Sequence, residues 1–409
     1  MSVPVHTPMT QFQVIDDCLQ IAGIPLTEVV KKTGMTPFYA YDSNLISQRI
    51  KYLKKILPAD IHLHYAIKAN PMQEVVSHVA SMVDGLDVAS GGELEIALAS
   101  GMAPGKISFA GPGKTEKELT SAIQAGITLN MESENEMMTI SRLGKELKLT
   151  PKVAIRVNPD FELKTSGMKM GGGPKQFGID AESVPDLLPK ISPAGLDFQG
   201  FHIFSGSQNL RAEAICETHD KTFELALSLC KKLSTPLKTL NIGGGFGIPY
   251  FPGETPLDVE KVCDNLKKLL PDVRKKLPDT EIIIELGRYL VGEAGIYVSK
   301  VIDRKISRGQ VFLVTDGGLH HHLAASGNFG QFIRKNYPVA VGNKMKGAER
   351  EIVNVVGPLC TPMDILADKM EMAKAEPGDM IVVFQSGAYG LTASPTAFLS
   401  HPAPAEIFL

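Results

Sequence analysis

Leu63-His-Tyr-Ala-Ile-Lys-Ala-Asn-Pro71 is the stretch of sequence from which the fold can be worked out. Its apolar, alternating first half is typical of a buried strand, and Asn70-Pro71 is a turn signal, so Lys68 stands at the carboxyl end of the strand. In a low-dielectric pocket the ammonium form of a lysine is disfavoured, its pKa falls, and the free amine can act as a nucleophile or Schiff-base former. The alternative is a lysine that extends from a strand end into solvent.

Seven further β-rich segments follow this strand, at 86–89, 107–110, 128–131, 153–157, 198–204, 239–242 and 282–286. Helical patterns lie between most of them, at 93–99, 116–125, 134–147, 212–233 and 258–276. Strands that alternate with helices pair in parallel, and eight such units in roughly 225 residues predict a closed (β/α)₈ barrel. A doubly wound open sheet is the alternative.

The predicted strands end in polar or glycine residues, and in a (β/α)₈ barrel functional groups gather at those ends. Gly243-Gly-Gly245 can offer backbone N–H groups to a phosphate, and Arg288 can supply a countercharge. Glu285 ends a wholly apolar strand and needs a partner such as a protonated heterocyclic nitrogen. Together with the amine of Lys68, these groups are what pyridoxal phosphate requires.

The two ends of the chain differ from the middle. After residue 295, apolar runs at 296–302, 311–315, 352–356 and 380–384 have no long helical pattern between them and predict an antiparallel β domain. Residues 1–40 contain a strand that can join it. We therefore expect a barrel over residues 41–294 and a β domain over residues 295–409, completed by the segment 1–40.

Composition excludes several classes of function. A net charge of −3 and the absence of Trp give no sign of binding to nucleic acid or anionic membranes. No signal peptide or membrane span is indicated, so we expect a cytoplasmic protein. The five cysteines form no Cys-x-x-Cys pair, and the adjacent residues His320-His-His322 cannot all face one ion, so no metal site is predicted.

Across nearly its whole length the chain resembles the fold type III (alanine-racemase-like) pyridoxal-phosphate decarboxylases, the group of diaminopimelate and ornithine decarboxylases. The motifs that carry this resemblance are His64-Tyr-Ala-Ile-Lys68-Ala-Asn, Asp87-Val-Ala-Ser-Gly-Gly-Glu93, Arg156-Val-Asn-Pro159, Phe201-His202, Gly243-Gly-Gly-Phe-Gly247, Glu285-Leu-Gly-Arg288, Gly357-Pro-Leu-Cys360 and Gly387-Ala-Tyr389-Gly.

The resemblance implies a role for each of these residues. Lys68 would form the internal aldimine, His202 would stack on the cofactor ring, and Glu285 would hold the pyridine nitrogen. Cys360 would reach the active site of the other subunit of a head-to-tail homodimer and protonate the substrate α-carbon. The remaining cofactor-binding residues would be Asp87, Arg156, Ser205, Gly243, Gly244, Gly245, Gly287, Arg288 and Tyr389.

The sequence departs from this family at the position that follows Cys360. The relatives carry an acidic residue there, which reads the distal amine or stereocentre of the substrate, whereas this chain has Thr361. Without that charge a free diamino acid loses its counter-ion, although Asp364 could partly replace it. Residues 161–178, which contain Lys164, could form a basic loop over the site or a solvated loop.

Two further segments, 317–329 and 386–395, are similar to the decarboxylases encoded with exosortase-type surface-polysaccharide systems. The chain also looks like the decarboxylase that acts on a glutamyl group carried on an acyl carrier protein. We therefore expect an α-amino-acid decarboxylase, with a carrier-bound substrate as one possibility. The alternatives are a diaminopimelate-type decarboxylase of a free amino acid, an amino acid racemase of the same fold and a non-catalytic homologue that binds pyridoxal phosphate.

Overall fold

The computed structural model describes residues 5–162, 168–331 and 333–409, which fall into two compact units. The barrel unit comprises residues 49–248 and 257–290. The β unit comprises the residues up to 48, residues 249–256 and residues 291–409.

The barrel unit contains eight parallel strands in the order β5-β6-β7-β8-β9-β12-β14-β15, and β15 pairs with β5 to close the barrel. This confirms the predicted (β/α)₈ barrel and rules out the open sheet. A short strand, β11 (Ile179–Asp180), adds to the end of β9. The barrel strands are β5 (Ile61–Ala66), β6 (Gly85–Val88), β7 (Ile107–Phe109), β8 (Thr128–Met131), β9 (Lys152–Asn158), β12 (Asp197–Ile203), β14 (Thr239–Gly244) and β15 (Glu281–Leu286).

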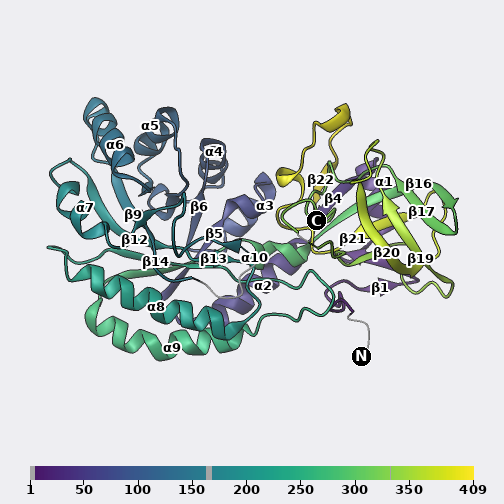
Figure 1. The fold of residues 1–409 in the computed structure, drawn as a ribbon, viewed down its shortest axis with the longest axis horizontal. Coiled ribbons are helices and arrows are strands. Elements are labelled where there is room, and N and C mark those ends of the chain that lie inside the picture. Colours follow the sequence, from purple (N-terminus) through teal and green to yellow (C-terminus); the bar gives the residue numbers. More distant parts are fainter. Residues whose placement is uncertain (1–4, 163–167, 332) are drawn as a thin grey trace. The chain divides into compact units, whose positions relative to one another are not determined.

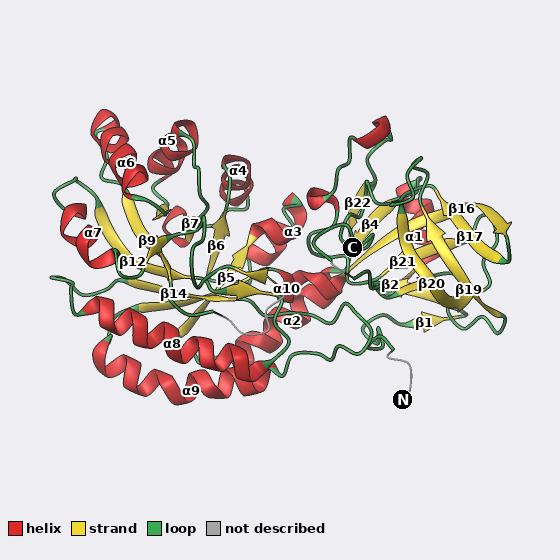
Figure 2. Ribbon diagram, in the orientation of Figure 1, coloured by secondary structure: helices red, strands yellow, loops and turns green. Residues whose placement is uncertain are grey.

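Helices lie around the outside of these strands (Figures 1 and 2). The sequence sets their ends locally: Thr115 and Glu118 form a capping box at the start of α5, and Gly126 ends that helix with a φ of 76°. Helices α3 and α7 occupy connections for which the sequence pattern predicted none. The helices are α2 (Ser43–Ile56), α3 (Gln73–Ala80), α4 (Gly91–Ala99), α5 (Glu116–Ala125), α6 (Glu134–Leu147), α7 (Val184–Ile191), α8 (Ala212–Cys230) and α9 (Val259–Lys276).

Side chains of the barrel strands alternate between two environments. On β5, Leu63 and Tyr65 are fully buried apolar residues, and His64 between them lines a cavity inside the barrel. On β15, Ile282 and Ile284 are likewise buried on either side of Ile283, which lines the same cavity. This period of two is that of a strand with two different faces. The inward face is unusual because barrels of this kind are commonly filled by branched apolar side chains.

The β unit contains a sheet in which most neighbouring strands are antiparallel, as predicted. Two pairs correct that prediction: β17 pairs in parallel with β19, and β22 pairs in parallel with β4. Parallel neighbours need a long crossover connection, and the chain between 316 and 349 provides one for β17 and β19. The strands are β4 (Phe38–Tyr41), β16 (Gly295–Ser307), β17 (Gln310–Thr315), β18 (Val339–Val341), β19 (Arg350–Val356), β20 (Ile365–Ala373), β21 (Met380–Val383) and β22 (Ala405–Phe408).

The amino-terminal segment completes the β unit, which confirms that part of the prediction. After the short strands β1 (Val14–Ile15), β2 (Cys18–Ile21) and β3 (Ile24–Pro25) and helix α1 (Leu26–Thr33), strand β4 pairs antiparallel with β16. The apolar core of the unit joins both ends of the chain: Leu19, Ile21, Leu26, Val29, Phe38, Ala40, Ile296, Val298, Val382 and Phe384.

The three adjacent histidines lie in a turn after β17 and are almost completely buried. His321 Nε2 lies 3.0 Å from the carbonyl oxygen of Pro402, and His322 Nε2 lies 2.9 Å from Ser386 Oγ. Burial lowers the pKa of His321 to about 4 and that of His322 to about 3. These side chains are therefore neutral groups packed in the interior of the β unit. Within the described residues, no helix combines the length and the apolar character that crossing a bilayer demands.

Candidate active site

Lys68 lies directly after β5, in the 3₁₀ turn Ile67–Ala69, as the sequence predicted. Hydrogen bonds hold this turn: the backbone N–H of Asn70 donates to the carbonyl oxygen of Ile67 at 3.0 Å, Tyr65 Oη donates to the carbonyl oxygen of Asn70 at 2.9 Å, and the backbone N–H of Met72 donates to Asn70 Oδ1 at 3.1 Å. Lys68 Nζ lies 5.5 Å from the centroid of the Phe204 ring. Lys68 is exposed, whereas Ile67 and Ala69 on either side of it are buried.

Glu285 and His202 meet inside the barrel. Glu285 Oε2 lies 3.1 Å from His202 Nε2, and Asn241 Nδ2 donates to the same oxygen at 3.4 Å. Burial alone would raise the pKa of Glu285, but the hydrogen bond from His202 and the charges of His202, Lys68 and Arg156 outweigh it and hold the pKa well below its ordinary value. Glu285 is therefore an ionised carboxylate in a buried site, which is the form that can accept a hydrogen bond from a protonated ring N–H.

Arg156 is held by a carboxylate that was not among the predicted site residues. Its Nη1 lies 2.8 Å from Glu132 Oε1, and both side chains are buried. Glu132 also accepts the backbone N–H of Gly111 at 2.5 Å and that of Gly178 at 3.0 Å. The charge of Arg156 lowers the pKa of Glu132 despite burial, which would raise it. Glu132 therefore joins three strand-end segments; the signal in the sequence was its position directly after β8.

The glycines after β14 permit a close approach of backbone. Gly243 and Gly245 have φ values of 70° and 83°, a conformation that favours glycine. A β-carbon on Gly243 would lie 2.8 Å from the carbonyl oxygen of Ile203, and one on Gly244 would lie 2.0 Å from that of Glu285. Ser205 Oγ is buried and makes no hydrogen bond within the described residues. An anion bound here would find a hydroxyl donor and unobstructed backbone.

His219 was missed by the sequence analysis because it lies in the middle of α8, away from any strand end. With Ser205 and Gly244 it lines a cavity of about 10 Å³. Burial lowers the pKa of His219 to about 4, so its imidazole is neutral. It packs behind the glycine segment as an uncharged group.

For the segment 161–178 the sequence left two alternatives open, a basic loop over the site and a solvated loop. Residues 163–167, and with them Lys164, lie outside the described residues. The rest of the segment is fastened to strand ends: the backbone N–H of Met170 donates to the carbonyl oxygen of Ser205 at 3.1 Å, and Asn158 Nδ2 donates to that of Gly173 at 3.0 Å. The glycines of this segment therefore lie at the carboxyl ends of β9 and β12.

Four of the predicted site residues belong to the β unit. Cys360 is exposed and Thr361 is half-buried, in the connection between β19 and β20. Asp364 is buried, and its two oxygens accept the backbone N–H groups of Leu319 at 2.6 Å and Leu359 at 2.8 Å. Burial raises the pKa of Asp364 more than these hydrogen bonds lower it. Tyr389 has a φ of 52° and precedes a 3₁₀ turn.

Several of these groups match the chemical needs of pyridoxal phosphate. The phosphate needs close backbone N–H groups and a hydroxyl, and the segment Gly243–Gly245 with the unpartnered Ser205 Oγ supplies a suitable setting. The pyridine nitrogen needs an ionised carboxylate, which Glu285 is. The aldehyde needs an amine at a strand end, where Lys68 lies. The residues present therefore fit this cofactor.

Comparisons with known proteins agree with this fit. Residues 43–292 match the family described as "Pyridoxal-dependent decarboxylase, pyridoxal binding domain". The L-glutamyl-[BtrI acyl-carrier protein] decarboxylase of Niallia circulans is 38% identical over 91% of this chain and 88% of its own. The diaminopimelate decarboxylase of Aquifex aeolicus is 34% identical over 99% of this chain and 93% of its own.

A solved structure extends the likeness to both units. The diaminopimelate decarboxylase from M. jannaschii in complex with L-lysine superimposes with a TM-score of 0.87, at 26% identity, and the match covers 97% of this chain and 92% of the other. The family match, which includes all eight barrel strands, and the two relatives above 30% identity agree. The chain therefore belongs to the pyridoxal-dependent decarboxylases, enzymes that remove carbon dioxide from their substrates with the help of pyridoxal phosphate.

Proposed function

We propose that this enzyme decarboxylates an α-amino acid carried on an acyl carrier protein, with an L-glutamyl group as the first candidate. The observation that carries this proposal is the uncharged side chain of Thr361, at the position where the family resemblance leads us to expect an acidic residue in decarboxylases of free diamino acids. A carrier-bound acyl group has no distal ammonium, so it needs no such counter-ion. The similarity to a relative named for a glutamyl carrier protein supports the same substrate class.

The barrel residues would hold the cofactor and fix its charge. Lys68 would bind the aldehyde carbon, Ser205 with the Gly243–Gly245 segment would bind the phosphate, and Glu285 would hold the pyridine nitrogen in its protonated form. Asp87, Arg156, Gly287, Arg288 and Tyr389 would complete the cofactor site. When bound, pyridoxal phosphate supplies the electron sink that accepts the electron pair released as the substrate carboxylate leaves as carbon dioxide.

The departing carboxylate must be replaced by a proton on the α-carbon. We assign this proton to the thiol of Cys360, donated across the interface of a homodimer in which each active site receives the partner subunit's Cys360. The thiol is exposed in the connection between β19 and β20, so it can reach a neighbouring molecule. A positioned general acid of this kind contributes about 10²–10⁴-fold to a rate.

The test is a screen by mass spectrometry for loss of carbon dioxide from a matched panel. The panel contains L-glutamyl-loaded carrier protein, unloaded carrier protein, free L-glutamate, diaminopimelate, lysine and ornithine. We expect release of carbon dioxide from the loaded carrier only. The same panel with the Lys68→Ala protein is the inactive control. Release from free glutamate as fast as from the loaded carrier would contradict the carrier requirement. Inversion of the configuration at the substrate α-carbon without release of carbon dioxide would instead identify a racemase.

A second candidate is decarboxylation of a free amino acid such as diaminopimelate. The observation that favours it is the 34% identity to the Aquifex aeolicus enzyme over nearly the whole chain. This candidate requires another group to replace the missing acidic side chain. Asp364 is three residues from Thr361, but its oxygens already bind two backbone N–H groups. Release of carbon dioxide from diaminopimelate in the same panel would select this candidate over the carrier-bound substrate.

A further inference from the structure

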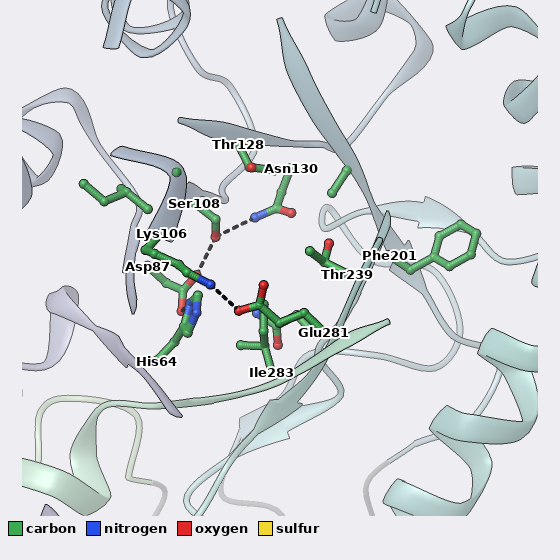
Figure 3. A pocket seen from close by; sticks show the side chains of 14 residues that line it. His64, Asp87, Lys106, Ser108, Thr128, Asn130, Phe201, Thr239, Glu281 and Ile283 are labelled. Atoms are coloured by element: carbon green, nitrogen blue, oxygen red, sulfur yellow. Dashed lines mark hydrogen bonds and ion pairs between the residues drawn. The ribbon is translucent and has the colours of Figure 1, made fainter. Parts of the chain in front are cut away.

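A polar cluster inside the barrel has no role in the scheme above apart from Asp87. It consists of His64, Asp87, Ser108 and Asn130, which come from the four consecutive strands β5, β6, β7 and β8 (Figure 3). His64 Nδ1 lies 3.3 Å from Asp87 Oδ2. Ser108 Oγ donates to Asp87 Oδ1 and accepts from Asn130 Nδ2 at 3.1 Å. The cluster is thus a continuous chain of polar contacts that ends at the imidazole of His64.

The backbone of β6 is shaped to receive this imidazole. Gly85 is the register partner of His64 on the neighbouring strand. A β-carbon at residue 85 would lie 2.3 Å from His64 Nε2 and 2.4 Å from Cε1. Any side chain at this position would therefore displace the ring. The glycine gives His64 one fixed place, from which Nδ1 faces Asp87.

The charges around His64 favour its protonated form. The groups that face it are Asp87 on β6 and Glu281 and Glu285 on β15. Lys106, in the 3₁₀ turn Pro104–Lys106 directly before β7, lines the same cavity, and its Nζ lies 2.7 Å from Glu281 Oε1. Burial by itself would lower the pKa of His64, but the negative charges of the three carboxylates outweigh it and the pKa lies above its ordinary value. A buried carboxylate such as Asp87 also requires a positive partner.

His64 is directly linked to the active site through the sheet. It is the register partner of Glu285 on the adjacent strand, and both side chains are buried. A cavity of about 50 Å³ adjoins the cluster (Figure 3). Both ring nitrogens of His64 and Asp87 Oδ2 make no hydrogen bond within the described residues. Because one water needs about 10–15 Å³ of such space, water can complete these contacts.

We propose that His64 is a positioning residue that carries a positive charge beside Glu285, and that this charge acts together with His202, Lys68 and Arg156 to keep Glu285 ionised and so to hold the proton on the ring nitrogen of the cofactor. The proposal rests on the role assigned to Glu285 in the proposed function. Asp87 holds the imidazolium in place, and Ser108 and Asn130 orient Asp87. Removing the positive charge makes Glu285 a stronger base, so the shared proton moves from the ring nitrogen toward the carboxylate.

The test compares His64→Gln with His62→Gln in the holoenzyme. His62 is two residues earlier on the same strand, its Nδ1 lies 3.2 Å from Glu281 Oε1, and its side chain is 39% exposed. His62→Gln therefore controls for the loss of an imidazole from β5. Nitrogen NMR of cofactor isotope-labelled at the ring nitrogen reports the proton directly and needs no turnover. We expect the signal of the His64→Gln protein to shift toward that of unprotonated pyridine, and the signal of the His62→Gln protein to match the wild type. An unshifted signal in folded, cofactor-loaded His64→Gln would overturn the proposal.

A second measurement does not depend on the folding of His64→Gln. In wild-type protein with isotope-labelled histidine rings, both His64 nitrogens should be protonated at neutral pH, and Asp87→Asn should convert the ring to its neutral form. A neutral His64 ring in the wild type, or a His64 ring that stays protonated in Asp87→Asn, would contradict the proposal. If Glu285→Gln leaves the signal of the ring nitrogen unchanged, the failure lies in the role given to Glu285, while the charge of His64 is still reported by its own signals.

Discussion

His202 Nε2 lies 3.1 Å from Glu285 Oε2, and both side chains are buried inside the barrel. The contact joins the ends of β12 and β15, which are separated by β14 in the barrel. Asn241 on β14 donates to the same oxygen, so three consecutive strands converge on one carboxylate. The hydrogen bond and the charge of His202, together with the charges of Lys68 and Arg156, hold the pKa of Glu285 low in a place where burial alone would raise it.

Replacement of Lys68 by Ala should abolish both the absorbance of the bound cofactor and the release of carbon dioxide. The reason is that Lys68 is the proposed covalent anchor of the cofactor. Within the described residues, no other lysine lies in the turn directly after β5. Absorbance spectra and gas release measure the two effects. Lys117→Ala, which removes an exposed lysine on α5, is the control and should behave as the wild type. Gas release that survives Lys68→Ala would contradict the assignment.

Replacement of Cys360 by Ala should leave cofactor binding intact and reduce turnover by about 10²–10⁴-fold, the usual contribution of a positioned general acid. Cys216→Ala, on α8 in the barrel unit, is the matched control. If active sites are shared, mixing the inactive Lys68→Ala and Cys360→Ala homodimers under exchange conditions should restore about a quarter of wild-type activity, because half of the dimers then contain one intact site. No recovery despite confirmed exchange would count against shared sites.

Replacement of Gly243 by Ala should weaken cofactor binding by at least about tenfold. The new β-carbon meets the carbonyl oxygen of Ile203 at 2.8 Å, in addition to the strain of a positive φ, which costs about 1–2 kcal/mol. Gly101→Ala separates the two effects, since Gly101 has a φ of 83° but open space around it. Titration of the unloaded proteins with pyridoxal phosphate measures the change. Equal affinities for the two variants would show that crowding at Gly243 is unimportant.

Replacement of Glu132 by Gln should destabilise the protein by about 3–5 kcal/mol at neutral pH because it leaves the buried charge of Arg156 without its partner. The pKa of Glu132 is lowered in the folded state, so its contribution is complete above the ordinary carboxyl pKa of about 4.3 and is lost as the pH falls through the folded value. The difference between the two proteins should therefore shrink on acidification. Urea unfolding at a series of pH values measures it.

The control for that experiment is Glu213→Gln, which breaks an exposed ion pair with Lys261 on the barrel surface. It should leave the unfolding free energy and its pH dependence nearly unchanged. If the loss of unfolding free energy in Glu132→Gln is the same at every pH, the charge of the Glu132 carboxylate contributes nothing to stability.

Replacement of Thr361 by Asp should shift selectivity toward free diamino acids. It places a negative charge next to Cys360, where it can pair with the distal amine of a diamino acid, so the affinity for diaminopimelate or lysine should rise and that for a glutamyl carrier should fall. Thr361→Asn, of the same size and without charge, is the control. Competition between free and carrier-bound substrates in one reaction measures the ratio. An unchanged ratio would place substrate selection elsewhere in the chain.

Much of the barrel could be predicted because local patterns determine it. The alternation around Leu63 and Tyr65 gave a strand within two residues of its observed start, and the helical pattern at 116–125 gave α5 with its observed bounds. The parallel pairing of β17 with β19 was missed because it depends on the path of a long connection. The sequence also could not predict that Thr361 is half-buried and Asp364 is buried, since both depend on the packing of loops that are distant along the chain.

The sequence by itself determined the order of strands and helices, the strand-end placement of Lys68, Glu285 and the Gly243–Gly245 segment, and from these the cofactor. Those features follow from periodicity and turn chemistry, which act over a few residues. Only the tertiary structure decided that Glu132 joins three segments around Arg156 and that His64 faces Asp87 over Gly85. Such contacts lie between residues of neighbouring strands, and the parallel pairing of those strands in the barrel brings them together.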